Sequence, residues 1–400
     1  MNIKNYSIVT ASYWGFTLTD GALRMLVLLH FHALGYSPVS LAFLFLLYEF
    51  CGVLTNLLGG WIGSRVGLKF TLYAGLALQI VALLMLSLLN PAWATALSVT
   101  YVMGSQALSG VAKDLTKMSS KSAVKLLVSD RDGALFKWVS ILTGSKNALK
   151  GVGFLLGGLL LTWFGFVGAL WLMASGLAIV LLAALLFLNQ DMGKTKSKVK
   201  FTQLFSKSRE INWLSAARMF LFASRDVWFV VALPVFLKES FGWSFNQVGS
   251  FMAAWVIGYG IVQASAPKLA RRGDPKRHAV SWAIGLGMTT LLLALLIQLE
   301  LFPVPSLMLG LAVFGIIFAI NSAVHSYLVL AFTDHDQVAL DVGFYYMANA
   351  CGRLLGTLLS GLMFLYGGLT ACLWTSAAMI IITALLSWPL RLNNHRSSAH

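Results

Sequence analysis

Long apolar stretches, each about 20 residues in length, follow one another along most of the chain and are separated by short polar segments. A helix of about 20 apolar residues is long enough to cross the hydrocarbon core of a bilayer. Breaks at glycine, proline and clustered charges therefore predict twelve membrane-spanning helices. The first six are predicted at 8–31, 39–62, 70–89, 93–112, 134–163 and 167–189, and the second six at 211–237, 246–266, 278–299, 305–330, 339–365 and 369–390.

Composition agrees with this pattern. Hydrophobic residues make up 58% of the 400 residues and charged residues only 11%, against roughly 25% charged in soluble domains. The mean hydropathy is +0.80. These values exclude a soluble enzyme, a disulfide-stapled secreted domain and a disordered chain. We therefore predict an all-α membrane protein.

A polar linker rich in lysine, at 191–210, divides the predicted spans into two sets of six. The halves 1–190 and 211–400 also share a pattern: Lys150 precedes Gly153 and Gly157 in the fifth span, as Arg353 precedes Gly356 and Ser360 in the eleventh. Repeated six-helix halves are common in secondary transporters. The sequence thus predicts two pseudo-symmetric six-helix bundles joined by a linker.

The basic residues predict the orientation of these spans. Twenty-one of the 29 Lys and Arg residues fall in segments on one side of the predicted membrane, and only Lys238 falls in the loops of the other side. Because Lys and Arg accumulate in cytoplasmic loops, both termini are predicted to be cytoplasmic. The same asymmetry accounts for the net charge of +15 without a nucleic-acid partner.

Polar residues inside the predicted spans are the candidates for function, because a charge at the bilayer centre costs about 2.5–3.5 kcal/mol. The interior charges fall in spans one, two, five, seven and eleven, and span ten adds neutral polar residues. The candidates for substrate binding are Arg24, Lys146, Lys150, Arg225, Arg353, Asn147 and Asn349. The candidates for charge balance or proton coupling are Asp20, Glu49, Asp226 and His325.

Alternatives remain open for several of these residues. Asp20 and Arg24 are four residues apart on one helical face and can form a structural ion pair. His325 can be a neutral, hydrogen-bonded residue, and Arg218 can serve gating, lipid contact or substrate contact. The lysines at four-residue spacing from Lys113 to Lys125 predict a basic stripe that attracts anionic lipid.

The interior charges predict an anionic substrate. Six interior cations, counting Arg218, face three interior carboxylates, and arginine and lysine suit phosphate or carboxylate recognition. Cys51, Cys351 and Cys372 lie in separate apolar stretches, which predicts neither a disulfide framework nor a metal site. No cofactor is expected.

Two short motifs resemble those of the major facilitator superfamily. The segment Gly60–Lys69 is similar to its loop motif Gly-x-x-x-Asp-Arg-x-Gly-Arg-Lys, with Ser64 at the acidic position, and Gly153–Gly158 is similar to an exporter motif, with Phe154 in place of proline. This resemblance implies two bundles around a central cavity that opens alternately to each side. It also implies a gating role for Gly60, Gly63, Arg65, Gly67 and Lys69.

Longer stretches resemble the ArsJ-type organoarsenical efflux permeases of bacterial arsenic-resistance operons. They are Tyr13–Met25, His30–Pro38, Ala107–Gly110, Lys113–Leu115, Lys117–Met118 and Leu142–Gly151. The resemblance implies a monomeric inner-membrane exporter of 1-arseno-3-phosphoglycerate, functionally linked to a glyceraldehyde-3-phosphate dehydrogenase. The alternative is an exporter or antiporter of another phosphate ester or organic anion.

Overall fold

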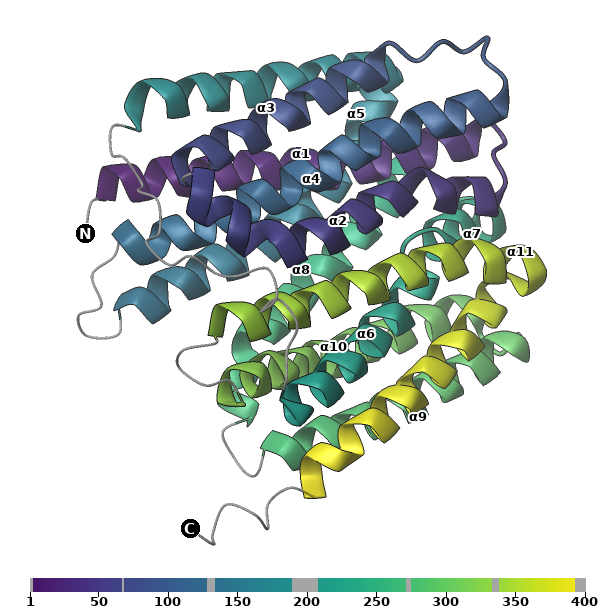
Figure 1. Cartoon of the computed structure of the whole chain (residues 1–400). Helices are drawn as coiled ribbons and strands as arrows, with labels where there is room; N and C mark the ends of the chain where they lie inside the picture. The colour runs from purple at the N-terminus through teal and green to yellow at the C-terminus, as the bar shows by residue number, and fades with distance from the viewer. Residues whose placement is uncertain are drawn as a thin grey trace, which may run out of the picture. The chain divides into compact units, whose positions relative to one another are not determined.

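A computed structural model describes residues 3–66, 68–127, 134–188, 208–270, 275–332 and 338–392. Within these ranges the regular secondary structure is entirely α-helical (Figure 1). The helices are α1 (Ile3–Ala33), α2 (Pro38–Val66), α3 (Leu68–Ser87), α4 (Thr95–Leu127), α5 (Ala134–Phe187), α6 (Arg209–Phe229), α7 (Ala232–Phe241), α8 (Phe245–Ala270), α9 (Pro275–Gln298), α10 (Pro303–Ala331) and α11 (Val338–Leu392). The predicted all-α fold is confirmed.

Breaks inside the longest helices relate these elements to the predicted spans. α5 is interrupted at Gly165, whose φ of 67° lies in the left-handed region that glycine adopts without strain. α11 is interrupted at Gly367 and Gly368. If α5 and α11 each supply two spans, and α6 with α7 supplies one, the described residues are consistent with twelve spans. Eight stretches of the described helices are long and apolar enough to cross a membrane.

The chain divides into two compact units. The first comprises residues 1–36, 43–199 and 237–257, and the second comprises 37–42, 200–236 and 258–400. Residues 37–42, from the first half of the sequence, therefore belong to the second unit. Residues 237–257, from the second half, belong to the first unit. The predicted boundaries at 190 and 211 remain a prediction.

In the first unit, glycines allow α5 to pack closely against α1. A Cβ atom at Gly153 would lie 2.6 Å from the Leu18 carbonyl oxygen, and one at Gly157 would overlap the Ala22 carbonyl oxygen. Small residues let membrane helices approach until their backbones touch. This contact fixes α1, which carries Asp20 and Arg24, beside α5, which carries Lys150.

In the second unit, α11 packs against α6 in the same manner. A Cβ atom at Gly352 would overlap the Met219 carbonyl oxygen, and one at Gly356 would lie 2.8 Å from the Ala223 carbonyl oxygen. The buried Ser360 Oγ accepts hydrogen bonds from the backbone N–H groups that follow α6, at 3.2 and 3.1 Å. The repeated glycine pattern thus corresponds to repeated helix packing.

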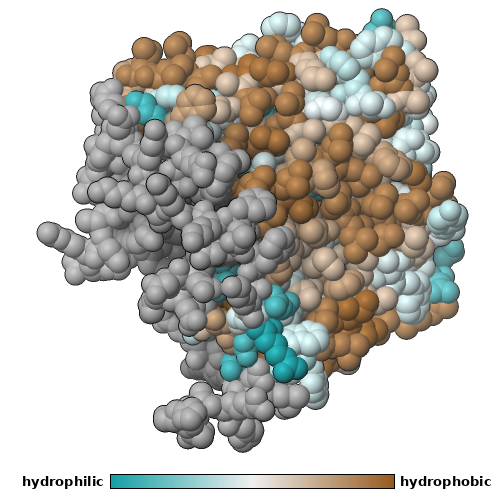
Figure 2. Space-filling model, in the orientation of Figure 1, coloured by the Kyte–Doolittle hydropathy of each residue, from teal (hydrophilic) through white to brown (hydrophobic). Residues whose placement is uncertain are grey.

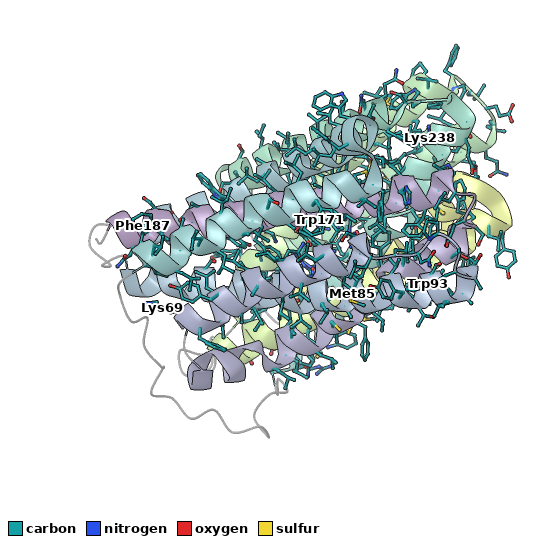
Figure 3. All side chains as sticks on the ribbon, turned by 90° about the horizontal axis from the view of Figure 1, so that it is seen from above. Lys69, Met85, Trp93, Trp171, Phe187 and Lys238 are labelled. Carbon is teal, nitrogen blue, oxygen red and sulfur yellow. The ribbon has the colours of Figure 1, made fainter. Side chains whose placement is uncertain are left out.

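Large apolar side chains cover much of the outer surface, as expected for helices in contact with lipid. Ile179 is 69% exposed and Met288 is 67% exposed. Hydrophobic residues dominate the described surface on the face drawn in Figure 2. In Figure 3, Lys69 and Phe187 lie toward one end of the first unit's helices, and Met85 and Trp93 lie toward the other end.

Candidate functional site

In the first unit, Arg24 forms an ion pair with Glu49 of α2. Arg24 Nη2 and Glu49 Oε1 are 2.5 Å apart, and the two side chains are 9% and 1% exposed. The guanidinium group also lies 5.2 Å from the ring centroids of Phe45 and Tyr48. The charge of Arg24 is therefore compensated inside the protein.

Asp20 has a different partner from the one that its spacing favours. The Tyr48 hydroxyl donates a hydrogen bond of 2.5 Å to Asp20 Oδ1. Tyr48 and Glu49 are neighbours on α2, and each reaches one of the two polar residues on the facing turn of α1. The structural ion pair considered for Asp20 and Arg24 is thus replaced by two contacts between helices.

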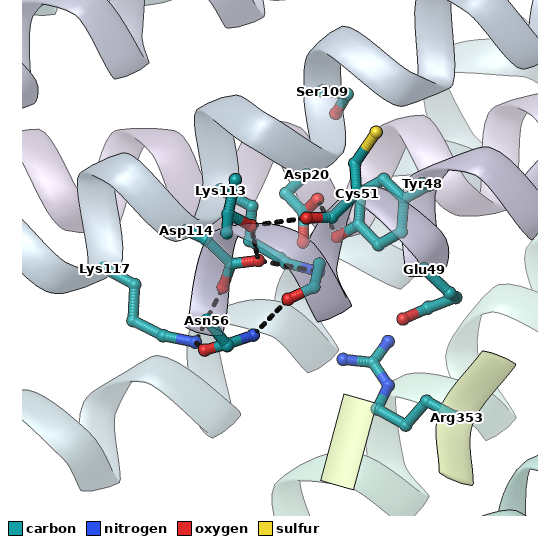
Figure 4. Close-up of polar contacts among 12 residues, drawn as sticks. Asp20, Tyr48, Glu49, Cys51, Asn56, Ser109, Lys113, Asp114, Lys117 and Arg353 are labelled. Carbon is teal, nitrogen blue, oxygen red and sulfur yellow. Dashed lines mark hydrogen bonds and ion pairs between the residues drawn. The ribbon is translucent and has the colours of Figure 1, made fainter. Parts of the chain in front are cut away.

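A second buried cluster surrounds Asp114 of α4 (Figure 4). Lys117 Nζ lies 2.6 Å from Asp114 Oδ1, and the Thr55 hydroxyl donates a bond of 2.9 Å to Oδ2. Lys117 also donates a bond of 2.7 Å to the Asn56 side-chain oxygen. Lys113 Nζ lies 3.9 Å from the same carboxylate.

This cluster was not predicted from the sequence, and it changes the interpretation of the basic stripe. Lys113 Nζ lies 4.0 Å from the centroid of the Tyr48 ring, and its side chain is 16% exposed. Lys113 and Lys117 therefore point into the protein, so a lipid-attracting role for these two is wrong. The (i, i+3) spacing of Asp114 and Lys117 was the available indication. The side chains of Lys121 and Lys125 lie outside the described residues.

The polar residues of α5 are half-buried. Lys146, Asn147 and Lys150 form part of the helix that packs on α1, and Lys150 Nζ lies 5.8 Å from the centroid of the Phe154 ring. The indole N–H of Trp14 donates a bond of 2.8 Å to Ser145 Oγ, which ties this stretch to α1. The substrate-binding roles of these three residues stay predictions.

In the second unit, one buried carboxylate forms ion pairs with two arginines. Arg225 Nη2 lies 2.5 Å from Asp226 Oδ1, and Arg353 Nε lies 3.4 Å from Oδ2. The side chain of Asp226 is 1% exposed. The predicted charge balance of Arg225 by Asp226 therefore extends across to α11.

Arg218 of α6 is the centre of a separate polar cluster. Its Nε donates to Asn349 Oδ1 at 2.9 Å, and its Nη1 donates to both the carbonyl and the hydroxyl of Ser322 at 3.0 Å. Only 4% of the residue is exposed. Among the described residues, these neutral oxygens are its hydrogen-bond acceptors. Asn349, predicted to contact substrate, thus contacts Arg218.

His325 and Asn321 lie one turn apart on α10 and are fully buried. Within the described part of the chain, neither ring nitrogen of His325 and neither amide atom of Asn321 has a hydrogen-bond partner. The sequence interpretation of His325 as a hydrogen-bonded core residue is therefore not supported within the described residues. Its coupling role stays a prediction.

The predicted gating segment is largely helical. α2 continues to Val66 and α3 begins at Leu68, so Gly60, Gly63 and Arg65 belong to the last turns of α2. Gly67 lies outside the described residues, as does the side chain of Arg65. Lys69 is placed, with Nζ 6.0 Å from the centroid of the Tyr73 ring. The gating role stays a prediction.

A comparison with known protein families identifies the family of this chain. A family model described as Major Facilitator Superfamily matches residues 7–231 and 214–400. The chain belongs to this superfamily. The protein is therefore a multi-pass membrane transporter of the secondary type and not an enzyme. A comparison with curated protein sequences finds no match.

Three solved structures share the superfamily fold. A POT family transporter in complex with a thioalcohol-conjugated peptide has a TM-score of 0.73 at 16% identity, with 94% of each chain covered. A bacterial homologue of the iron transporter ferroportin, in an inward-facing state, has a TM-score of 0.73 at 15% identity, covering 98% of this chain and 99% of that one. A D-xylose–proton symporter has a TM-score of 0.74 at 14% identity, with 96% of each chain covered. Because the three proteins are described with a peptide, iron and D-xylose, the shared fold does not select a substrate.

Proposed function

We propose that the protein is a secondary exporter of a small, multiply anionic phosphate or arsenate ester, and specifically of 1-arseno-3-phosphoglycerate. The superfamily supplies the transport mode. The long stretches similar to ArsJ-type permeases support the arsenical cargo, and they include Asp20, Arg24, Lys146 and Lys150. Export of an unstable arsenate ester would remove arsenate from the cell and confer arsenate resistance.

The observation that carries the proposal is the charge composition of the helix interiors. In the second unit, Arg218, Arg225 and Arg353 lie within α6 and α11, and the Asp226 carboxylate contacts Arg225 and Arg353. A cation in a low-dielectric interior is stabilised when an anionic substrate binds beside it. Arginine also binds phosphate-like groups through two parallel hydrogen bonds.

The distribution of sulfur argues against a pump for trivalent arsenic, which would favour soft thiolate ligands. Cys51 lies on α2, and Cys351 and Cys372 lie on α11 on either side of its break. Among the described residues, no group of three or more His, Cys, Asp or Glu side chains is placed to hold a metal ion. A variant in which all three cysteines are replaced by alanine is expected to keep its export activity.

The decisive experiment uses inverted membrane vesicles containing the full-length protein. Glyceraldehyde-3-phosphate dehydrogenase, its substrate, NAD and radiolabelled arsenate are supplied outside, and label inside the vesicles is measured. Accumulation that requires the dehydrogenase supports the proposed cargo. Accumulation without the enzyme would show that arsenate itself is transported, and no accumulation above empty vesicles would contradict the proposal.

Substitutions test the predicted binding residues in the same vesicles. Lys150→Gln and Arg353→Gln are expected to abolish accumulation while the protein still inserts into the membrane. Arg277→Gln is the matched control, because Arg277 is an exposed cation at the start of α9. Unchanged arsenate resistance in cells that express either interior variant would contradict the assignment of these residues.

A further inference from the structure

The cluster around Arg218 combines a buried cation with neutral protein partners. Arg218 uses Nε and Nη1 for its three hydrogen bonds to Asn349 and Ser322. Its Nη2, which carries two further N–H donors, has no acceptor among the described residues. The guanidinium group stacks on Phe222 and Tyr345, with its central carbon 4.1 and 5.1 Å from their ring centroids, so it is held in one orientation.

Several donors approach a single acceptor in this cluster. Besides Arg218, the Gln263 amide and the Tyr259 hydroxyl of α8 both approach the same Ser322 Oγ, at 3.3 and 3.5 Å. These distances are longer than well-formed hydrogen bonds, and one hydroxyl oxygen has only two lone pairs. The two N–H donors of Arg218 Nη2 would be satisfied by a group with several acceptor oxygens and no donor, such as a phosphate or arsenate ester.

A second, independent observation concerns Asn321 and His325, which lie on α10 before and after Ser322. Asn321 and His325 are fully buried beside Ser322, and four of their polar atoms have no partner within the described residues. Buried polar groups are normally hydrogen-bonded, and an unsatisfied one costs about 1–3 kcal/mol. The unsatisfied atoms indicate that this part of the second unit is built to receive a polar group.

Arg24, Arg225 and Arg353 are less suited than Arg218 to bind an anionic substrate. Arg24 is paired with Glu49, and Arg225 and Arg353 contact Asp226, so an anion would compete with a carboxylate at each of them. Arg218 has no such competitor among the described residues. Nine residues of helix, about 14 Å, separate it from the start of α6, so it lies well inside the bundle.

From these contacts we propose that Arg218, with Asn349 and the polar face of α10, binds an oxyanion group of the transported ester. The assignment rests on the proposed function and names the residues of the second unit that recognise the cargo. Arg218 supplies the charge through Nη2. Asn349 and Ser322 orient the guanidinium plane, and Asn321 and His325 lie on α10 within three residues of Ser322.

The sharpest test is Asn349→Asp. This nearly isosteric change places a carboxylate at the position that now accepts the bond from Arg218 Nε at 2.9 Å, so Arg218 acquires an internal counter-ion. The variant keeps Arg218 and is expected to unfold at a temperature no lower than that of the unmodified protein. Its affinity for an oxyanion is nevertheless expected to fall by about tenfold or more, because the new carboxylate competes for the guanidinium.

The affinity is measured by titrating 3-phosphoglycerate, a stable relative of the cargo, into the protein in nanodiscs of phosphatidylcholine, which offer no anionic lipid. Asn212→Asp is the matched control, because Asn212 is an exposed residue of α6 in the same unit. Arg218→Gln is expected to lose binding as Asn349→Asp does. Glycerate, which lacks the phosphate, is expected to bind less tightly to the unmodified protein.

Two results would overturn the assignment, and they are distinguishable. If Asn349→Asp and Arg218→Gln bind 3-phosphoglycerate as tightly as the unmodified protein while the vesicles still export the arsenical, the site is wrong and the proposed function stands. If the unmodified protein binds no 3-phosphoglycerate and exports no arsenical, the site and the proposed function fail together.

Discussion

The ion pair between Arg24 and Glu49 supports a quantitative prediction for Glu49→Gln. The substitution keeps the shape of the side chain but removes the negative charge, and it leaves the Arg24 guanidinium buried without the oxygen now 2.5 Å away. Breaking a buried ion pair by removing one partner costs about 3–5 kcal/mol. Since glutamine can still accept a hydrogen bond, we expect a loss of about 3 kcal/mol in the free energy of unfolding.

A double-mutant cycle separates the pair from its surroundings. In Arg24→Gln with Glu49→Gln neither member of this pair is charged, so the double variant is expected to be more stable than the sum of the two single losses implies. The coupling energy is expected to be about 2 kcal/mol. The matched control is Glu239→Gln, because Glu239 is a surface carboxylate of the same unit whose side chain is 53% exposed.

The assay is thermal unfolding of the purified protein, followed by the fraction that remains monodisperse on size-exclusion chromatography. Glu49→Gln is expected to lower the midpoint by about 5 °C or more, and Glu239→Gln by less than about 2 °C. Equal midpoints for the two variants, or fully additive losses in the cycle, would refute the reasoning. The charge of Arg24 would then be compensated by something other than Glu49.

Three further predictions follow from packing and buried polar contacts. Gly157→Leu is expected to separate α5 from α1 and to reduce the yield of folded protein sharply, whereas Gly176→Leu, at a position open to the surface, is expected to leave the yield unchanged; equal yields would contradict the close contact. Asp114→Asn is expected to destabilise the first unit by about 3 kcal/mol, since Lys117 loses its carboxylate, and adding Lys117→Gln should restore part of the thermal midpoint. Ser360→Ala is expected to lower the free energy of unfolding by about 1–3 kcal/mol, because two buried N–H groups at the junction of α6 and α7 lose their acceptor. A thermal midpoint within about 1 °C of that of the unmodified protein would contradict this role.

The helical fold was predictable because apolar length alone determines which segments cross a bilayer. Helix ends were less predictable. α4 continues to Leu127, well beyond the predicted end of its span at 112, since a helix does not stop where its apolar residues stop. The same extension carries Lys113, Asp114 and Lys117 into a packed cluster, which hydropathy places in a loop.

Partners across helices were the least predictable part of the candidate site. Spacing places Asp20 and Arg24 on one face, but it does not say that Tyr48 and Glu49 of α2 face them. Arg225 beside Asp226 was predictable because the two are adjacent in sequence. Arg218 was left undecided, because the neutral oxygens that surround it come from α10 and α11, over a hundred residues away.

The glycine contacts between α1 and α5 have a mechanical consequence. With Gly153 and Gly157 in direct contact with the backbone of α1, the two helices have no room to slide or tilt against each other. During a transport cycle α1 and α5 would move as one rigid body. The carboxylate of Asp20, the guanidinium of Arg24 and the amine of Lys150 would then be displaced together. A cargo bound to Arg24 or Lys150 would therefore move together with both residues and with the Asp20 carboxylate.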